Sequence, residues 1–436
     1  MSFIRPNSPP STGLSMKPRA YVFYQYMPPD DVVSAVHFGD LCSGLAARGW
    51  QVSAFPCIRS CRDPSQRFAS FERWRGVMVR RIYRPGLRPS SGVGRMLNSL
   101  WMVAAWSLLA LRPGAAPDVV IVGTDPPLSV LVALFWRLVR PGTRVAHWCF
   151  DLYPEVAAAD GLISDNGPAA GLFRFFLRGA YGRCSLLADI GPCMRDLLLA
   201  YPSPARRETL VPWALIERAH PLATDMGERD SLFGRVRLAL LYSGTFGRAH
   251  SYEGILDLAE ALRNDGVGLV FSIRGNREAE LRAEVRSRRS GITFVDFAPE
   301  ERLQARLACA DVHIVSLRPE WTGMVVPSKF FGAISAGRPV LFLGSERSSI
   351  ARWIQQFQIG WVLAPSNVAE VASALRDYAS SGEQQTVMRE RCCSVYAQHF
   401  AREVQIDRWD LLLREISARL GGGPTRVEKD TIRPRT

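Results

Sequence analysis

Residues 236–255 read VRLALLYSGTFGRAHSYEGI, and this stretch indicates which kind of fold to expect. The apolar run 236–244 predicts a strand. It ends at a glycine-containing turn that carries Arg248, and a helix is predicted to begin near Ser251. Strand, turn and helix in this order predict a β/α unit, and phosphate-binding loops commonly lie at such a turn. The alternative is that Arg248 is an ordinary surface arginine.

Strand-like runs alternate with helical stretches on both sides of this unit. The predicted strands are 19–26, 51–57, 118–125, 143–151, 185–191 and 208–214 before it, and 268–275, 292–297, 312–317, 338–344 and 360–365 after it. A charged linker is predicted between the two series, at 214–235. Two successive β/α series imply an α/β fold with two doubly wound parallel sheets. Ligands of such sheets bind beyond the carboxyl ends of the strands, so two facing domains would form a cleft.

Composition restricts the partners. The chain has 436 residues and a net charge of +13, which favours an anionic partner. Its nine cysteines show no zinc spacing and are expected to be reduced thiols of a cytosolic protein. The polar, proline-rich N-terminus lacks the apolar core of a signal peptide. The apolar stretch 96–111 falls short of the ~20 residues of a spanning helix, so we expect a buried or membrane-touching helix.

The segment VPSKFFGAISAG (326–337) contains an unusual lysine. All but three of the 54 Lys and Arg residues are arginine, and the other two lysines, Lys17 and Lys429, lie near the chain ends. Lys329 stands at a predicted helix start, where Ser328 could cap the helix and Gly337 could end it. A helix start with a compact ammonium group is typical of a phosphate site. The alternative is a solvated surface lysine.

Two aspartates end neighbouring buried strands of the first half. Asp151 lies in HWCFDLYPE (147–155) and could orient a hydroxyl group or act as a base. His147, within that strand, is interpreted as a packed core histidine. Asp125 lies in GTDPPL (123–128), and its alternative role is to cap the following helix.

The stretch 59–88 carries nine arginines interleaved with aromatic residues. This pattern suits RNA stacking, an anionic membrane surface, or the ordinary surface of an arginine-rich chain. Because no nucleic-acid module is recognisable, we favour membrane contact over nucleic acid. The segment 172–183 adds a second basic helix with an apolar face.

With these motifs in hand, the chain resembles family-4 glycosyltransferases of the two-domain GT-B fold, in particular bacterial enzymes of exopolysaccharide, O-antigen and colanic-acid synthesis. The resemblance covers about residues 19–418 and is carried by YSGTFGRAH, ADVHIVSLRPE, VPSKFFGAISAGRPVLF, GTDPPL and DLYPE. It implies an acceptor-binding Rossmann-like domain at 18–215 and a nucleotide-sugar-binding domain at 216–398. A helix at 399–420 would cross back to the first domain, and residues 1–17 and 421–436 would be disordered.

The resemblance also implies the site. Arg248 and Lys329 would bind the donor diphosphate beside Gly244 and Ser328, and Asp151 would be catalytic with them. Pro28, Pro29, Asp30 and Asp125 would bind the acceptor near the reacting hydroxyl group. A hexose would be transferred with retention, without a metal or other cofactor. The partners would be a nucleotide-sugar and a lipid-linked saccharide, and the enzyme would lie peripherally on the inner face of the cytoplasmic membrane.

The chain departs from the family pattern at one place. Many members carry two glutamates seven residues apart, where this sequence has Met324 and Gly332. The backbone amides of Thr322, Gly323, Met324 and Val325 are then left to hold the donor sugar, with Glu320 nearby. A sugar-nucleotide epimerase of the same architecture and a non-catalytic partner subunit are the alternative functions.

Overall fold

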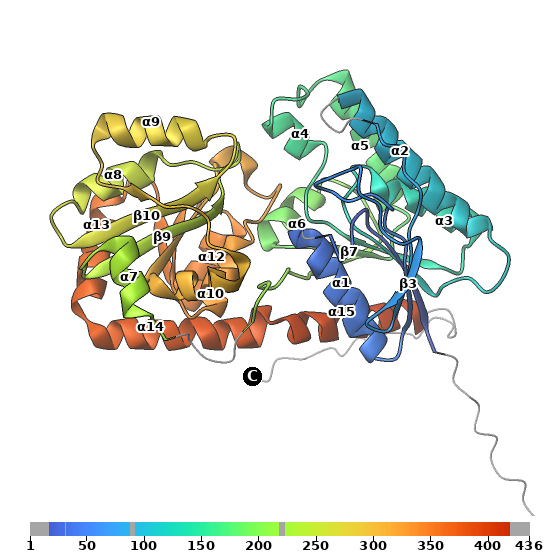
Figure 1. Ribbon diagram of the computed structural model, residues 1–436. Helices are drawn as coiled ribbons and strands as arrows, with labels where there is room; N and C mark the ends of the chain where they lie inside the picture. The colour runs from blue at the N-terminus through green and yellow to red at the C-terminus, as the bar shows by residue number, and fades with distance from the viewer. Residues whose placement is uncertain (1–16, 31, 88–91, 218–222, 419–436) are drawn as a thin grey trace, which may run out of the picture.

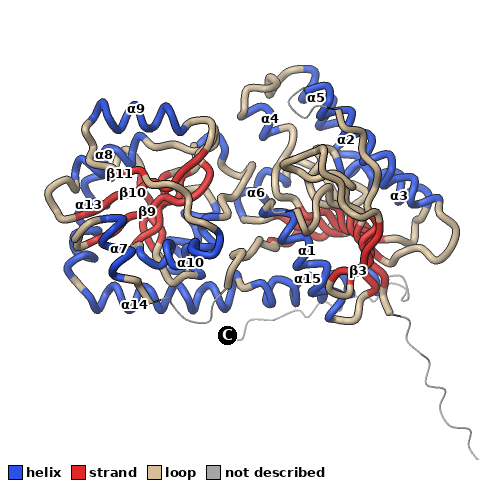
Figure 2. Tube along the Cα trace, viewed as in Figure 1, coloured by secondary structure: helices blue, strands red, loops and turns tan. Residues whose placement is uncertain are grey.

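The computed structural model describes residues 17–30, 32–87, 92–217 and 223–418, which form two α/β domains side by side (Figure 1). The predicted N-terminal extension, apart from Lys17, and the predicted C-terminal tail lie outside the described residues. Figure 2 shows one sheet in each domain with helices around it. The GT-B-like arrangement expected from the sequence is therefore confirmed.

The first domain contains an eight-stranded sheet in the order β3-β4-β2-β1-β5-β6-β7-β8. Its strands are β1 (Arg19–Phe23), β2 (Gln51–Ala54), β3 (Phe71–Trp74), β4 (Val77–Arg80), β5 (Val119–Val122), β6 (Arg144–Trp148), β7 (Leu186–Asp189) and β8 (Arg206–Thr209). All neighbouring strands pair in parallel except β3, which runs antiparallel to β4.

The β3–β4 hairpin corrects the expectation of a wholly parallel sheet. It lies within the arginine-rich stretch 59–88, where the charged residues obscured a period of two. Val77 and Val79 point into the core and are fully buried, and Gly76 forms the turn with a φ of 79°. Arg81 is also buried and pairs with Glu72 at 2.6 Å. Part of the stretch 59–88 therefore belongs to the folded core of the domain and is not available as a binding surface.

Six α-helices of the first domain are described: α1 (Val33–Ala47), α2 (Gly92–Leu108), α3 (Val132–Val139), α4 (Glu155–Ala159), α5 (Pro168–Tyr181) and α6 (Pro192–Leu198). The inner face of α1 is apolar, and its Phe38, Leu41 and Leu45 are buried. Gly49 follows with a φ of 92°, a conformation that favours glycine after a helix.

The second domain contains a six-stranded parallel sheet in the order β11-β10-β9-β12-β13-β14. Its strands are β9 (Leu238–Thr245), β10 (Val267–Arg274), β11 (Thr293–Phe294), β12 (Val312–Ser316), β13 (Val340–Leu343) and β14 (Gly360–Leu363). The helices between and after them are α8 (Glu253–Ala261), α9 (Glu278–Arg288), α10 (Glu300–Cys309), α11 (Lys329–Ser335), α12 (Ser349–Phe357), α13 (Val368–Ser380) and α14 (Gly382–Val395).

The predicted linker contains a helix that the sequence reading missed, α7 (Met226–Phe233). Asp225 caps it by accepting a hydrogen bond from the amide of Glu228 (3.1 Å). Arg229 of this helix is buried and pairs with Asp311 at 2.7 Å, at the start of β12. The many charged residues of this segment obscured the helical pattern in the sequence. One buried ion pair attaches the helix to the second domain.

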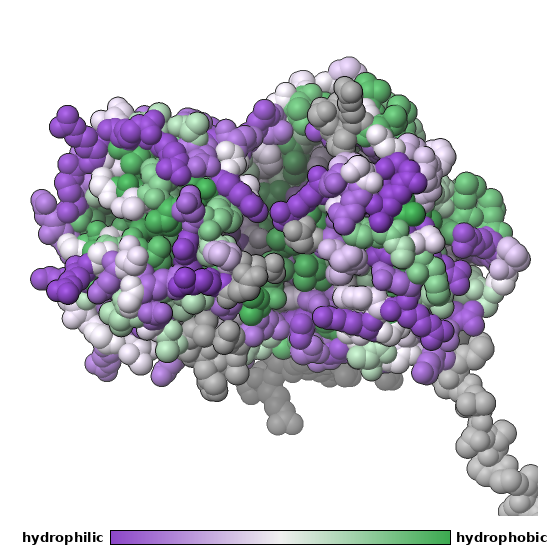
Figure 3. Space-filling view, in the orientation of Figure 1, coloured by the Kyte–Doolittle hydropathy of each residue, from purple (hydrophilic) through white to green (hydrophobic). Residues whose placement is uncertain are grey.

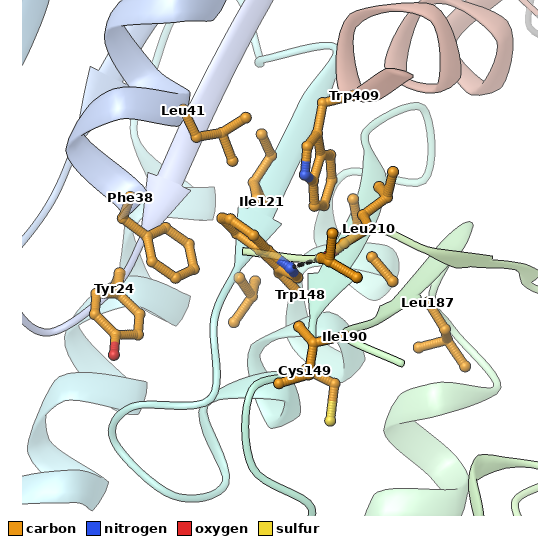
Figure 4. Packing of buried hydrophobic residues seen from close by; sticks show 14 of the residues in the cluster. Tyr24, Phe38, Leu41, Ile121, Trp148, Cys149, Leu187, Ile190, Leu210 and Trp409 are labelled. Atoms are coloured by element: carbon orange, nitrogen blue, oxygen red, sulfur yellow. Dashed lines mark hydrogen bonds between the residues drawn. The ribbon is translucent and has the colours of Figure 1, made fainter. Parts of the chain in front are cut away.

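The last helix, α15 (Arg402–Ala418), packs on the first domain. Figure 1 shows α14 and α15 running along one side of both domains. The Trp409 ring lies 5.3 Å from that of Trp148, whose indole N–H donates to the carbonyl oxygen of Leu210 at 2.8 Å (Figure 4). Truncating a buried tryptophan typically costs about 3–5 kcal/mol, so α15 belongs energetically to the first domain's core.

Candidate active site

A cleft of about 1040 Å³ lies between the two domains, and residues of both line it. Figure 3 shows the furrow where the domains meet. The first-domain wall includes Tyr26, Asp125 and Tyr153, which follow β1, β5 and β6. The opposite wall includes the loop Gly247–His250 after β9 and Asn276 after β10. The lining residues therefore follow the carboxyl ends of parallel strands, where ligands of this fold type bind.

Lys329 lies behind the loop that follows β9 and is not itself among the residues that line the cleft. Its Nζ donates to the carbonyl oxygen of Thr245 at 2.9 Å and lies 5.3 Å from the centre of the Tyr242 ring. Among the described residues, no carboxylate is within ion-pair distance of it. Burial lowers the pKa of Lys329 to about 8. An anion in the cleft could therefore pair with this ammonium group, which has no described carboxylate beside it.

Gly244 explains why a slender side chain stands at position 329. Its φ is 129°, and a Cβ atom added there would lie 2.5 Å from Cε of Lys329. The predicted proximity of Gly244 to Lys329 thus corresponds to direct packing. A planar guanidinium group is broader than an ammonium group and would crowd this passage.

The predicted helix-start contribution to phosphate binding is weaker than expected. The amides of Phe330 and Phe331 already donate to the carbonyl oxygens of Pro327 and Ser328. Ser328 occupies the N-cap position of α11, but its side chain makes no capping hydrogen bond, so the expected cap is wrong. Ser328 is exposed, and α11 is only seven residues long.

Arg248 lines the cleft and is half exposed, with 56% of its side chain accessible. It bonds to Asp160 of the first domain, with 3.2 Å from Nη1 to the carboxylate and 3.2 Å to the main-chain oxygen. The arginine predicted to bind a diphosphate therefore already forms a bond across the cleft.

His250, two residues further on, is a candidate site residue that the sequence pattern does not identify. It lines the cleft, and its Nδ1 donates to the carbonyl oxygen of Ser316 at 2.8 Å. Burial, and next the charge of Lys329, lower the pKa of His250 to about 4. An uncharged imidazole is therefore present beside the two cations. Its position in the loop five residues after the end of β9 was the available signal.

Asp125 and Asp151 lie close together at the ends of β5 and β6. The two strand ends are joined by the amide of Phe150, which donates to Oγ1 of Thr124 at 3.2 Å. Burial, together with the charge of Asp151, raises the pKa of Asp125 to about 7. Burial raises the pKa of Asp151 to about 6. Asp125 lines the cleft rather than capping a helix, whereas Asp151 is not among the residues that line it. The raised pKa values bring the titration of both carboxyl groups closer to neutral pH.

The loop Pro28-Pro29-Asp30 is placed away from the cleft. Asp30 is buried and accepts hydrogen bonds from Oγ of Ser60 (3.0 Å) and the amide of Cys61 (2.9 Å). The carbonyl oxygen of Pro28 accepts a bond from Arg81 at 3.0 Å. This loop fastens the segment around the β3–β4 hairpin, and the structure does not bring it to the predicted acceptor position.

The segment around 320–325 joins the two domains. The amides of Thr322 and Met324 donate to the carbonyl oxygens of Pro319 and Trp321, so these two amides are not available to a sugar. The carbonyl oxygen of Met324 accepts a bond from the amide of Leu152, next to Asp151, at 3.0 Å.

Gly323 has a φ of 86° and packs against Leu197 of α6, and Val325 forms a bridge with Thr322. Glu320 is exposed and does not line the cleft, whereas the neighbouring Trp321 does. Most of the residues predicted to hold the donor sugar therefore form a domain contact.

His147 is confirmed as a core histidine. It is buried, its Nδ1 donates to the carbonyl oxygen of Val122 at 3.0 Å, and burial lowers its pKa to about 4. All nine cysteines, each in the described part of the chain, are unpaired thiols.

Within the described ranges, no group of three or more His, Cys, Asp or Glu side chains is arranged to hold a metal ion. None of the described helices is long and apolar enough to cross a membrane.

Comparisons with known proteins agree with this geometry. Residues 34–214 match the "Glycosyl transferase 4-like domain" family. The chain is 22% identical over 295 residues to the "Probable glycosyltransferase WbjE" of Pseudomonas aeruginosa, covering 65% of this chain and 72% of that protein.

Among solved structures, the fold is similar to sucrose-phosphate synthase from Thermosynechococcus elongatus, with a TM-score of 0.70 and 17% identity over 92% of this chain and all of that chain. It is also similar to WaaG, a glycosyltransferase involved in lipopolysaccharide biosynthesis, with a TM-score of 0.59 and 17% identity over 93% of this chain and all of that chain. The GT-B fold is thereby confirmed, and the resemblance to family-4 glycosyltransferases is carried by residues 34–214, which match the glycosyl transferase 4-like domain model.

Proposed function

We propose that the protein transfers a hexose from a nucleotide-sugar to a lipid-linked saccharide in the synthesis of a bacterial surface polysaccharide. The observation that carries the proposal is the cleft itself, with the cation Arg248 on one wall, Lys329 directly behind that wall, and the carboxylate Asp125 on the other. Cations facing the half-buried carboxylate Asp125, with Asp151 close to it, suit a reaction in which a diphosphate leaves and a hydroxyl group loses its proton. The similarity to WaaG, which is involved in lipopolysaccharide biosynthesis, supports the choice of polysaccharide chemistry.

In the proposed reaction, the acceptor oxygen bonds to the anomeric carbon on the face from which the diphosphate departs, so the configuration is retained. The bond from that carbon to the diphosphate oxygen breaks. Arg248 and Lys329 stabilise the negative charge that develops on the leaving group. The hydroxyl proton passes to Asp125 on the cleft wall and is shared with Asp151, because the charges of the two carboxyl groups interact.

A thermal-shift screen against nucleotide-sugars tests the donor. A ligand present at 100 times its dissociation constant stabilises by about 2.7 kcal/mol. Each binding donor is then incubated with bacterial lipid extract, and transfer is followed by a radiolabelled sugar. We expect transfer that Lys329→Ala slows about 10²–10³-fold. Isomerised free donor without transfer would instead identify an epimerase.

Metal independence is part of this proposal, and its basis is positive charge supplied by the chain. Two cations beside one leaving group can replace the charge of a divalent ion. We expect the transfer rate to remain largely intact in excess EDTA. Complete loss that magnesium or manganese restores would contradict this part.

We further propose that the enzyme works on the inner face of the cytoplasmic membrane. Exposed apolar side chains gather on α2 and α5, and the upper right of Figure 3 is green over these helices. Exposed arginines of the β3–β4 hairpin lie on the same domain. Apolar residues next to basic ones are suited to an anionic lipid surface.

A further inference from the structure

Arg84 is a buried cation without a matching anion in the described part of the chain. Its side chain is 4% exposed, and Nη1 donates to the hydroxyl oxygen of Tyr26 at a long 3.4 Å. The Nε atom is buried and has no hydrogen-bond partner. By contrast, the equally buried Arg81 has the carboxylate of Glu72 at 2.6 Å and two carbonyl oxygens.

Burying an unpaired guanidinium group costs free energy. Its five N–H donors are suited to binding an oxyanion. The carboxyl group whose charge interacts with Arg84 is that of Asp125, but the two groups are beyond ion-pair distance. Burial and the charge of Asp151 raise the pKa of Asp125 to about 7. Arg84 lines the interdomain cleft, as does the exposed Arg95 of α2. Both arginines therefore border the cleft.

Apolar side chains line the cleft near Arg84 and continue onto the outer surface of the first domain. Met96, Leu162 and Phe173 line the same cleft. Met96 is 39% exposed and Leu162 is 60% exposed, so these side chains belong both to the cleft and to the outer surface. On α2 the neighbouring Leu97 and Leu100 continue the exposed apolar face. A ligand with an anionic group at Arg84 thus has an apolar path out of the cleft.

We propose that Arg84, assisted by Arg95, binds a phosphate group of a lipid phosphate or diphosphate acceptor, whose hydrocarbon chain lies along Met96, Leu162 and Phe173. This assignment rests on the proposed transferase function. It gives the cleft two oxyanion sites on opposite walls, one for the leaving diphosphate at Arg248 and one for the acceptor. The bidentate fork of arginine suits phosphate oxygens. The acceptor sugar would then extend from Arg84 towards Asp125.

Farnesyl diphosphate is a soluble probe of this site, because it combines a diphosphate with an isoprenoid chain. Its binding is measured by calorimetry in the intact chain with saturating nucleoside diphosphate, which occupies the donor site. Arg84→Gln should weaken binding of the probe about 10–100-fold, the loss expected for a charged hydrogen-bond donor. Arg84→Lys should recover part of it, and Arg95→Gln should cause a smaller loss.

Arg80→Gln is the matched control, since Arg80 is an exposed arginine of β4 outside the cleft lining. It should bind the probe as the wild type does. Circular dichroism verifies folding of each variant, and Arg95→Gln on the exposed face of α2 serves if Arg84→Gln does not fold. Equal affinity of the wild type, Arg84→Gln and Arg95→Gln for the probe would overturn the proposal.

Two further measurements separate the alternatives. Nucleoside diphosphate binding should be unaffected by Arg84→Gln, and its absence in the wild type would count against the transferase function while leaving the farnesyl diphosphate result interpretable. Partition onto phosphatidylglycerol liposomes should also be unaffected. If Arg84→Gln reduced that partition while farnesyl diphosphate failed to bind, the site would recognise a membrane headgroup and the acceptor assignment would be wrong.

Discussion

At the scale of single residues, Lys329 offers the sharpest test. Its contact with a leaving diphosphate strengthens as charge develops, so its loss should lower turnover more than donor affinity. We expect Lys329→Ala to reduce kcat about 10²–10³-fold. Lys329→Arg should fold yet be badly impaired, because Gly244 packs so closely on the lysine stem. Lys17→Arg is the control, and near-normal turnover of Lys329→Arg would show that charge alone matters.

Asp125 is expected to lower stability as pH rises. Its folded pKa of about 7 is above the model-peptide value near 3.9, so the unfolded chain releases this proton at lower pH than the folded chain. Stability is therefore lost progressively between about pH 4 and pH 7. Asp125→Asn should raise the Tm by several degrees at pH 8 and by less at pH 5, measured by calorimetry. The same Tm difference at both pH values would contradict the raised pKa.

At the scale of helices and strands, α2 and α5 present the apolar face of the proposed membrane contact. Leu97 and Leu100 are 50% and 47% exposed, and Phe175 of α5 is 69% exposed. Replacing Leu97 by Asp should reduce liposome binding about tenfold, because a leucine is no longer buried on docking. Binding should rise with anionic lipid and fall with salt.

The control for this prediction is Leu411→Asp. Leu411 is 58% exposed on α15, away from the proposed contact, and its replacement should leave liposome binding unchanged. Equal partition of the wild type onto neutral and acidic vesicles would remove the electrostatic part of the proposal.

At the scale of the whole molecule, the bond between Arg248 and Asp160 joins the two walls of the cleft. A donor diphosphate at Arg248 has to compete with this carboxylate. An exposed ion pair is worth roughly 0.2–1 kcal/mol, so Asp160→Asn should tighten nucleotide-sugar binding by up to about fivefold. The gain should shrink at high salt.

Calorimetric titration with the donor measures this effect. Asp165→Asn is the control, because Asp165 pairs with Arg174 within the first domain. Weaker binding by Asp160→Asn would show that Asp160 takes part in holding the donor instead of competing with the diphosphate.

Much of this molecule could be predicted from local pattern. Apolar runs of the right length predicted the strands of both sheets apart from the β3–β4 hairpin and β8, a polar strand that begins and ends before the predicted run 208–214 does. The strand-end positions of Arg248 and Asp125 brought both to the cleft. The hairpin was missed because five exposed arginines outweighed the alternation of Val77 and Val79. Helix α7 was missed because a short, highly charged helix has little periodicity of its own.

By itself, the sequence determined the α/β class, the two series of strands, the core role of His147 and the isolation of Lys329 from other lysines. These follow from residue types and their spacing along the chain. Only the tertiary structure decided that Asp30 is buried and supports a loop, that residues 322–325 form a domain contact, and that Arg84 borders the cleft with no described carboxylate within ion-pair distance. Such roles depend on which side chains from distant segments come together and exclude water, and no local pattern records that.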